Sequence, residues 1–150
     1  MLTLSSDGTA LTGLWLDGQK YFGAGLPNAV KENDLPVFEQ AVRQLRAVGI
    51  SVIVHQILGL PGETPEQMVE TARYIGKSGA SGVKFHLLHV LRGTDLEPLW
   101  RSGAVTCPEQ DAYIKILEAC LRNIPREMVV HRLTGDGAKR DLLAPLWSAD

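Results

Sequence analysis

Residues 54–64 read VHQILGLPGET, and this stretch decides the fold class. An apolar run over residues 52–58, within a predicted strand at residues 50–58, stops at a glycine-rich turn, residues 59–62. Thr64-Pro65-Glu66-Gln67 follows after Glu63. Those four residues form a capping box with proline at the first helical position, which is typical of a helix start. The sequence therefore predicts a buried strand that ends in a turn and leads into a helix.

Further segments repeat this pattern along the chain. Apolar residues at helical spacing follow the capping box, and residues 83–91 (VKFHLLHVL) predict the next strand. Thr106-x-x-Glu109 predicts the start of another helix, and residues 128–131 predict a third strand. Strands that alternate with helices in this way are expected to be parallel neighbours with right-handed crossovers. Shorter helices are predicted at residues 94–101 and 139–143.

The region before residue 50 has a different character. Residues 2–5 and 10–16 alternate weakly around Asp7-Gly8, a dipeptide that favours a primed hairpin turn. Residues 23–33 contain Gly, Pro and Asn and predict a loop. Asp34 and Pro36 then indicate the start of a helix that Gly49 closes. The start of the chain is therefore expected to be a β-hairpin followed by a loop and a helix.

Composition excludes several classes of protein. The chain has 150 residues, of which 45% are hydrophobic and 21% charged, so we expect a packed core rather than disorder. Its formal net charge of −2 gives no general attraction to nucleic acid. Two cysteines without a Cys-x-x-Cys motif indicate no disulfide framework, and a cytoplasmic location is the default expectation. No apolar stretch approaches the roughly 20 residues of a membrane span.

The glycine turn is the first candidate site. Ligands bind outside the carboxyl ends of strands in parallel α/β sheets, and glycines let a backbone approach a ligand closely. One interpretation is a tight strand–helix connection whose glycines serve geometry alone. The other is a nucleoside site, in which backbone groups near Gly59 and Gly62 contact a ring or ribose and Glu63 accepts hydrogen bonds. The residues leave both interpretations open.

Histidines and cysteines provide weaker candidates. His86 and His89 are three apart on a predicted strand, so they should point to opposite faces and cannot share one metal ion. One of them could face a pocket, but the favoured alternative is a hydrogen-bonded histidine in the core or facing a helix. The same two interpretations apply to His55 and His131, which lie on neighbouring predicted strands. Arg132 directly follows a predicted strand and could line the rim of the same candidate site, at the ends of the strands. Cys107 lies at a helix start, which favours a thiolate, but a capping-region thiol is the simpler role, and Cys120 is expected in the core.

From about Leu45 the chain resembles the C-terminal half of a radical S-adenosylmethionine (SAM) barrel, close to the YhcC-like family. The matching segments read VGISVIVHQILGLPGETPEQM, GVKFHLLHVLRGTDLEPLW and VVHRLTGDGAKRDLLAPLW. In such barrels the strand and turn equivalent to residues 54–63 contact the SAM adenine. The resemblance therefore implies SAM as cofactor and one set of binding residues: Gly59, Leu60, Gly62, Glu63, His86, His89 and Arg132. It also implies a [4Fe–4S] cluster, yet the 150 residues contain no Cys-x-x-x-Cys-x-x-Cys loop, and Cys107 and Cys120 cannot replace it.

From Leu2 to about Val42 the chain is similar to another family. LTLSSDGTALTGLWLDGQKYF and DLPVFEQAV resemble the N-terminal domain of methylated-DNA–protein cysteine methyltransferases. That resemblance implies an RNase H-like supporting domain, but the acceptor motif Pro-Cys-His-Arg is absent from this sequence. The seam could fall inside one continuous helix near residues 36–48.

These observations predict an α/β fold, with a hairpin and loop segment at residues 1–42 and a partial (βα) barrel, half of a radical SAM barrel, at residues 43–150. The predicted function is a radical SAM segment that binds SAM weakly, has no catalytic residue or metal ligands of its own, and does not cleave SAM. A DNA-repair accessory domain and a non-catalytic interaction module are the alternatives. Open strand edges predict self-association or a partner chain that completes the barrel. Nucleic acid and membranes are not expected partners.

Overall fold

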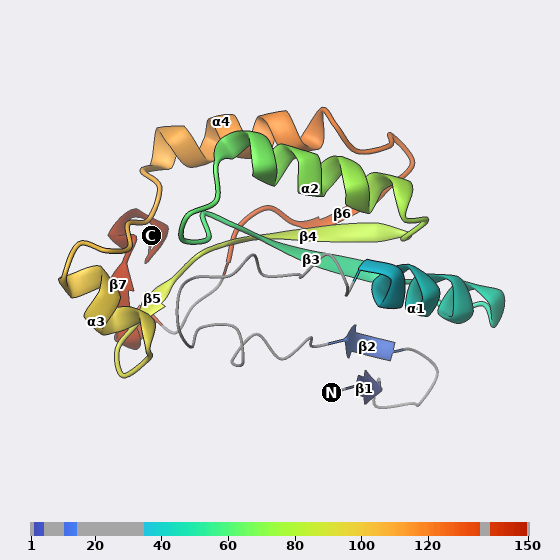
Figure 1. Ribbon diagram of the computed structural model, residues 1–150, viewed down its shortest axis with the longest axis horizontal. Coiled ribbons are helices and arrows are strands. Elements are labelled where there is room, and N and C mark those ends of the chain that lie inside the picture. The colour runs from blue at the N-terminus through green and yellow to red at the C-terminus, as the bar shows by residue number, and fades with distance from the viewer. Residues whose placement is uncertain (1, 5–10, 15–34, 136–138, 150) are drawn as a thin grey trace.

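A parallel three-stranded sheet forms the centre of the molecule (Figure 1). The computed structural model describes residues 2–4, 11–14, 35–135 and 139–149. In the sheet, β3 (Ile53–Leu58) and β6 (Val129–Arg132) flank β4 (Gly82–Leu87), and both pair with it in parallel. Ile53 lies opposite Gly82, and Gly82 lies opposite Val129. The predicted parallel strands are therefore confirmed, with β3 beginning three residues later than expected.

Two helices cover one face of this sheet. Figure 1 shows α2 (Pro65–Lys77) and α4 (Gln110–Leu121) side by side on the same side of β3, β4 and β6. Apolar side chains from both helices and from the strands form one buried cluster. Burial of such side chains is the main favourable term in folding. The cluster comprises Leu58, Met68, Ala72, Ile75, Ala80, Val83, Phe85, Leu87, Tyr113, Leu117, Cys120 and Met128.

Helix α1 (Leu35–Ala47) precedes β3 and packs near the C-terminal part of α2. The Tyr74 hydroxyl donates a hydrogen bond of 2.9 Å to Glu39 Oε1, and the Phe38 and Tyr74 rings lie 6.0 Å apart. Gly49 follows the helix with φ +79°, the left-handed conformation predicted for the residue that closes it. Asp34, the other predicted boundary residue, lies outside the described residues.

The predicted strand over residues 83–91 is wrong as a continuous element. β4 ends at Leu87, and after a break β5 (Val90–Leu91) pairs antiparallel with β7 (Leu142–Ala144). The Leu88 amide still donates to the Leu58 carbonyl at 3.0 Å, but β3 ends there and turns away at Gly59. The chain beyond Leu88 therefore has no parallel partner in β3, and it takes a new one from the C-terminal segment.

Two predicted helix boundaries also need correction. Helix α4 begins after Glu109 without a side-chain cap, so the expected capping box at Thr106 does not form. Pro108 disfavours helical backbone at the residue before it, which explains the later start. Residues 139–143 were expected to form one helical turn, but only Lys139–Asp141 is a 3-10 helix, because β7 begins at Leu142. The short helix α3 (Leu96–Arg101) lies inside its predicted range.

The N-terminal hairpin is confirmed in its two strands. β1 (Leu2–Leu4) pairs antiparallel with β2 (Leu11–Leu14). The predicted turn at Asp7-Gly8 and the loop at residues 23–33 lie outside the described residues. Among the helices that the structure describes, none has the length and apolar character to cross a bilayer.

Candidate ligand-binding face and turn

The two faces of the sheet have different chemistry. Successive side chains on a strand point to opposite faces. The face that meets α2 and α4 carries Leu58 and Phe85, which are wholly buried, and Gln56, whose Nε2 donates to the Met68 carbonyl at 2.7 Å. The alternate residues point to the other face, which we call the open face. It consists of Ile53, His55 and Ile57 on β3, Lys84 and His86 on β4, and Val129, His131 and Arg132 on β6.

A row of basic residues crosses the open face. His55 lies opposite Lys84, and Lys84 lies opposite Arg132, across all three strands. The pairing register shifts between Val83 and Lys84, and this irregularity brings Arg132 rather than His131 level with Lys84. The row therefore combines an imidazole, an ammonium and a guanidinium group at one level of the sheet.

Two histidines stack on this face. The rings of His55 and His86 have centroids 5.0 Å apart and an interplanar angle of 27°. Desolvation, followed by the nearby His86, Lys84, Arg132 and His131, lowers the pKa of His55 to about 4. Desolvation is the first cause although His55 is exposed overall, because one side of its ring faces another ring.

His86 has a similar electrostatic environment. Desolvation first, and then Arg132, Lys84 and His89, lower the pKa of His86 below its usual range. Its Nε2 is buried and has no hydrogen-bond partner. Because His86 pairs opposite Ile57 on the open face, the expectation of a helix-facing histidine is wrong for this residue. A buried nitrogen without a partner is available to a ligand on this face.

The turn after β3 begins with a tightly packed glycine. Gly59 has φ +88°, and a Cβ there would lie 2.9 Å from Pro108 Cδ and 3.1 Å from Pro108 Cγ. Its amide faces Met68 Sδ at 3.4 Å. Gly59 is therefore enclosed by the segment before α4, and close packing is one reason for glycine at this position.

The other end of the turn is open. Gly62 has φ +79°, and a Cβ there would meet nothing within 4 Å. Next to it, Glu63 is half-buried, and its Oε2 is buried without a hydrogen-bond partner. Desolvation raises the pKa of Glu63 to about 7. Near neutral pH this carboxyl group can thus either donate or accept a hydrogen bond.

Segments from the C-terminal part of the chain pack beside the carboxyl ends of the strands. The Trp147 indole donates to the Pro108 carbonyl at 3.1 Å, and the Tyr113 hydroxyl donates to the Leu133 carbonyl at 2.6 Å. His89 lies beyond the end of β4, where its Nε2 is 3.1 Å from Ser148 Oγ. A Cβ at Gly135 would come within 2.8 Å of His89 Cε1. His89 is thus held among the closing segments rather than on a strand face.

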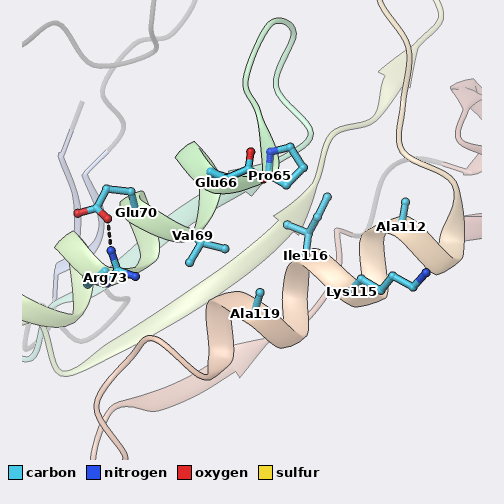
Figure 2. A pocket seen from close by; sticks show the side chains of 9 residues that line it. All are labelled: Pro65, Glu66, Val69, Glu70, Arg73, Ala112, Lys115, Ile116 and Ala119. Carbon is cyan, nitrogen blue, oxygen red and sulfur yellow. Dashed lines mark hydrogen bonds and ion pairs between the residues drawn. The ribbon is translucent and has the colours of Figure 1, made fainter.

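An open groove lies elsewhere, between α2 and α4 on the helix layer (Figure 2). Its floor is apolar, with Val69 from α2 and Ala112, Ile116 and Ala119 from α4. Glu70 and Arg73, which form an ion pair, and Lys115 contribute charged groups. The groove is separated from the open face by the sheet and carries none of the residues that the sequence singled out as a cofactor site.

The structure brings together some of the expected cofactor residues and separates others. Gly59, Leu60, Gly62 and Glu63 form one turn, while His86 and Arg132 lie on the open face. Lys84 did not emerge from the sequence as a candidate. The alternation in VKFHL, which puts Lys84 and His86 on one face, was the signal that could have found it.

Comparison with known proteins gives the class of this fold. Residues 80–150 match the family model described as the Radical_SAM C-terminal domain. With the parallel α/β sheet, this match makes the C-terminal part of the chain a radical SAM-related segment. The resemblance of residues 1–42 to a methyltransferase domain stays a prediction.

Individual relatives cover more of the chain. It is 38% identical over 120 residues to "Uncharacterized protein YtqA" of Bacillus subtilis, a match that covers 80% of this chain and 37% of that protein. It is 30% identical over 115 residues to "Protein YhcC" of Escherichia coli K12, covering 77% of this chain and 37% of the relative. The chain therefore spans little more than a third of the length of these relatives.

The radical SAM class implies SAM and an iron–sulfur cluster, and the two groups fit this chain differently. Cys120 is wholly buried in the core, where burial first and then the nearby Glu63 raise its pKa to about 11. Burial also raises the pKa of Cys107, whose Sγ is 3.8 Å from the Leu88 carbonyl, and this disfavours a thiolate at that position. Within the described ranges, no group of three or more His, Cys, Asp or Glu could hold a metal ion. These residues do not fit a cluster, whereas the unpartnered Glu63 Oε2 and His86 Nε2 are compatible with an organic ligand.

Proposed function

We propose that this chain is a SAM-binding radical SAM segment that holds the nucleoside end of the cofactor and does not cleave it by itself. The observation that carries the proposal is the turn at the carboxyl end of β3, with an open Gly62 beside a carboxyl oxygen of Glu63 that has no partner. Ligands bind at such ends of parallel strands. An adenine amino group is a suitable donor to that oxygen.

We propose unequal roles for the expected residues, on the basis of the same geometry. Gly59 is buried against Pro108, so Leu60, Gly62 and Glu63 are the parts of the turn that we expect a ligand to reach. His86, on the open face of β4, has a buried ring nitrogen without a hydrogen-bond partner. His89 and Arg132 would act at the margins of the site. Weak binding is expected, because most of a bound nucleoside would remain in contact with water.

Cleavage of SAM needs an electron from a cluster, and the part of the chain that the structure describes supplies no ligand set for one. An iron–sulfur activity would therefore require cysteines from another polypeptide or region.

Calorimetric titration with SAM tests the proposal. We expect binding by the wild type and its loss in Glu63→Ala. Glu70→Ala is the matched control, since it removes a carboxylate from helix α2, which follows the turn, at a position that lines the groove. No heat with the wild type, or equal heat with Glu63→Ala, would contradict SAM binding. Binding of O6-alkylguanine DNA that is lost on deletion of residues 1–34 would favour the DNA-repair alternative instead.

A further inference from the structure

The basic row on the open face, His55, Lys84 and Arg132, has no acidic partner among the described residues. In the part of the chain that the structure describes, the ion pairs are Arg43–Glu39, Arg73–Glu70, Arg101–Glu97, Arg122–Glu118 and Arg140–Asp141. Lys84 and Arg132 are absent from this set. Like charges directly opposite one another in a sheet are destabilising. An arrangement that costs stability and is not neutralised within the described residues is a candidate for ligand binding.

The groups around the row match the chemistry of an oxyanion. A guanidinium and an ammonium group both donate hydrogen bonds to phosphate and carboxylate oxygens, and arginine does so in a forked geometry. The stacked rings of His55 and His86 provide further ring nitrogens beside them, and His86 Nε2 is buried without a partner. His131 covers Gly82 on the same face, where its Nε2 would lie 2.9 Å from an added Cβ.

We propose that the open face, through Lys84, Arg132 and the stacked pair His55 and His86, binds a small molecule that carries a doubly charged oxyanion, a phosphate monoester or a dicarboxylate. SAM itself does not satisfy this row. It carries one carboxylate against an ammonium and a sulfonium group, so two protein cations would repel more charge than they neutralise. The oxyanion is therefore a second ligand. It shares His86 and Arg132 with the proposed SAM site, but its binding does not require SAM.

The pKa values of the two histidines distinguish this site from a basic surface that attracts anions without a defined binding site. The pKa values of His55 and His86 are lowered by desolvation and by the charges of Lys84 and Arg132, together with His131 for the first and His89 for the second. A bound dianion offsets those charges. It should therefore raise the pKa of both histidines, so that the two rings take up protons on binding as pH falls below 7.

Proton NMR of the histidine rings tests this with inorganic phosphate and malonate as probes. The chain has four histidines, so each ring signal can be followed through a pH titration. We expect saturable shifts at His55 and His86 and an upward move of the His55 pKa from about 4. Tighter binding of phosphate than of malonate would identify the ligand as a phosphate ester, and the reverse order would identify a dicarboxylate.

Charge variants provide the control. Lys84→Gln and Arg132→Gln should each weaken binding of the preferred probe by roughly tenfold, the usual effect of losing one charge-assisted hydrogen bond. Lys115→Gln removes the same charge from the groove on the other side of the sheet and should leave binding unchanged. Arg132→Lys should retain part of the affinity, and circular dichroism of each variant checks folding.

Three results would overturn the inference. The first is the absence of a saturable shift of the histidine signals with either probe. The second is a weakening of probe binding by Lys115→Gln equal to that by Lys84→Gln. The third is a set of shifts confined to His89 and His131, without a change in the His55 pKa. If the protein binds the oxyanion but gives no heat with SAM, only the proposed function is rejected. If it binds SAM but not the oxyanion, only this inference is rejected.

Discussion

The two glycines of the turn after β3 serve different purposes, although both have positive φ. A side chain at Gly59 would overlap Pro108, whereas a side chain at Gly62 would enter open space. Both positions require the left-handed conformation that only glycine adopts without strain. Gly59 thus fixes how closely the segment before α4 approaches β3, and Gly62 leaves one side of the turn accessible.

We expect Gly59→Ala and Gly62→Ala to differ in their effect on the free energy of unfolding. Gly62→Ala should cost about 1 kcal/mol, the strain of positive φ alone. Gly59→Ala adds the overlap with Pro108 and should cost roughly 2–4 kcal/mol. Urea denaturation measures both, with Gly49→Ala as a second open position at φ +79°. Equal losses at Gly59 and Gly62 would show that Pro108 moves aside freely.

Glu63 should make stability depend on pH. Its folded pKa of about 7 lies above the usual value of 4.5, so the folded state binds the proton more tightly than the unfolded state does. The contribution is full below pH 4.5 and is lost as pH rises through 7. Since the residue is only half-buried, solvent screening reduces the effect to roughly 1–2 kcal/mol.

The comparison of wild type with Glu63→Gln isolates this effect. We expect the free energy of unfolding of the wild type to fall relative to the variant between pH 5 and pH 7, measured by denaturant titration at each pH. His55 titrates with the opposite sign, because its folded pKa is lowered, but it contributes equally to both proteins. A constant difference between the two proteins would show that the carboxyl group is not desolvated in solution.

At the scale of elements, α2 depends on a start signal that could be read from the sequence. Thr64 Oγ1 accepts a hydrogen bond from the Gln67 amide at 3.3 Å, and the Thr64 amide donates to Gln67 Oε1 at 2.8 Å. We expect Thr64→Ala to destabilise the protein by about 1 kcal/mol in thermal or urea unfolding. Thr71→Ala, at an exposed site inside the same helix, should cost less than half as much. A larger loss at Thr71 would contradict the role of the cap.

The same elements show where sequence reasoning succeeds and where it stops. Capping, glycine and hydrophobic periodicity are local signals, and they predicted α2, β3 and the turn between them. The break after Leu87 has no local signal, since VKFHLLHVL contains no glycine, proline or other turn-favouring residue. It arises because β3 ends at Leu58 and because Leu142–Ala144 supplies a new partner more than fifty residues away.

The candidate site was predictable to a similar extent. The turn and Glu63 followed from spacing, but the level pairing of Lys84 with Arg132 depends on a register shift in β6 that the sequence does not signal. The burial of Gly59 under Pro108 likewise joins two segments that are distant in the chain. Contacts of this kind follow from tertiary packing, so they were outside what periodicity could predict.

For the whole molecule, the main feature is a sheet whose two faces and two edges differ in what covers them. Helices α2 and α4 cover one face, and within the described residues β3 and β6 each pair with β4 alone, which leaves one edge of each without a strand. Unpaired strand edges are templates for association. Ile57 on β3 is also 43% exposed. We therefore expect concentration-dependent self-association through the free edge of β3.

Charge placed on that edge should weaken the association. Ile57→Lys puts a cation on an edge strand already close to Lys84 and His86, so two copies would repel each other, and we expect the dissociation constant to rise by at least roughly tenfold. Ile114→Lys is the matched control, because Ile114 is 51% exposed on α4, away from the edge. Sedimentation velocity over a range of concentrations measures both. A wild-type chain that stays monomeric throughout, or equal weakening by Ile114→Lys, would exclude the β3 edge as the contact.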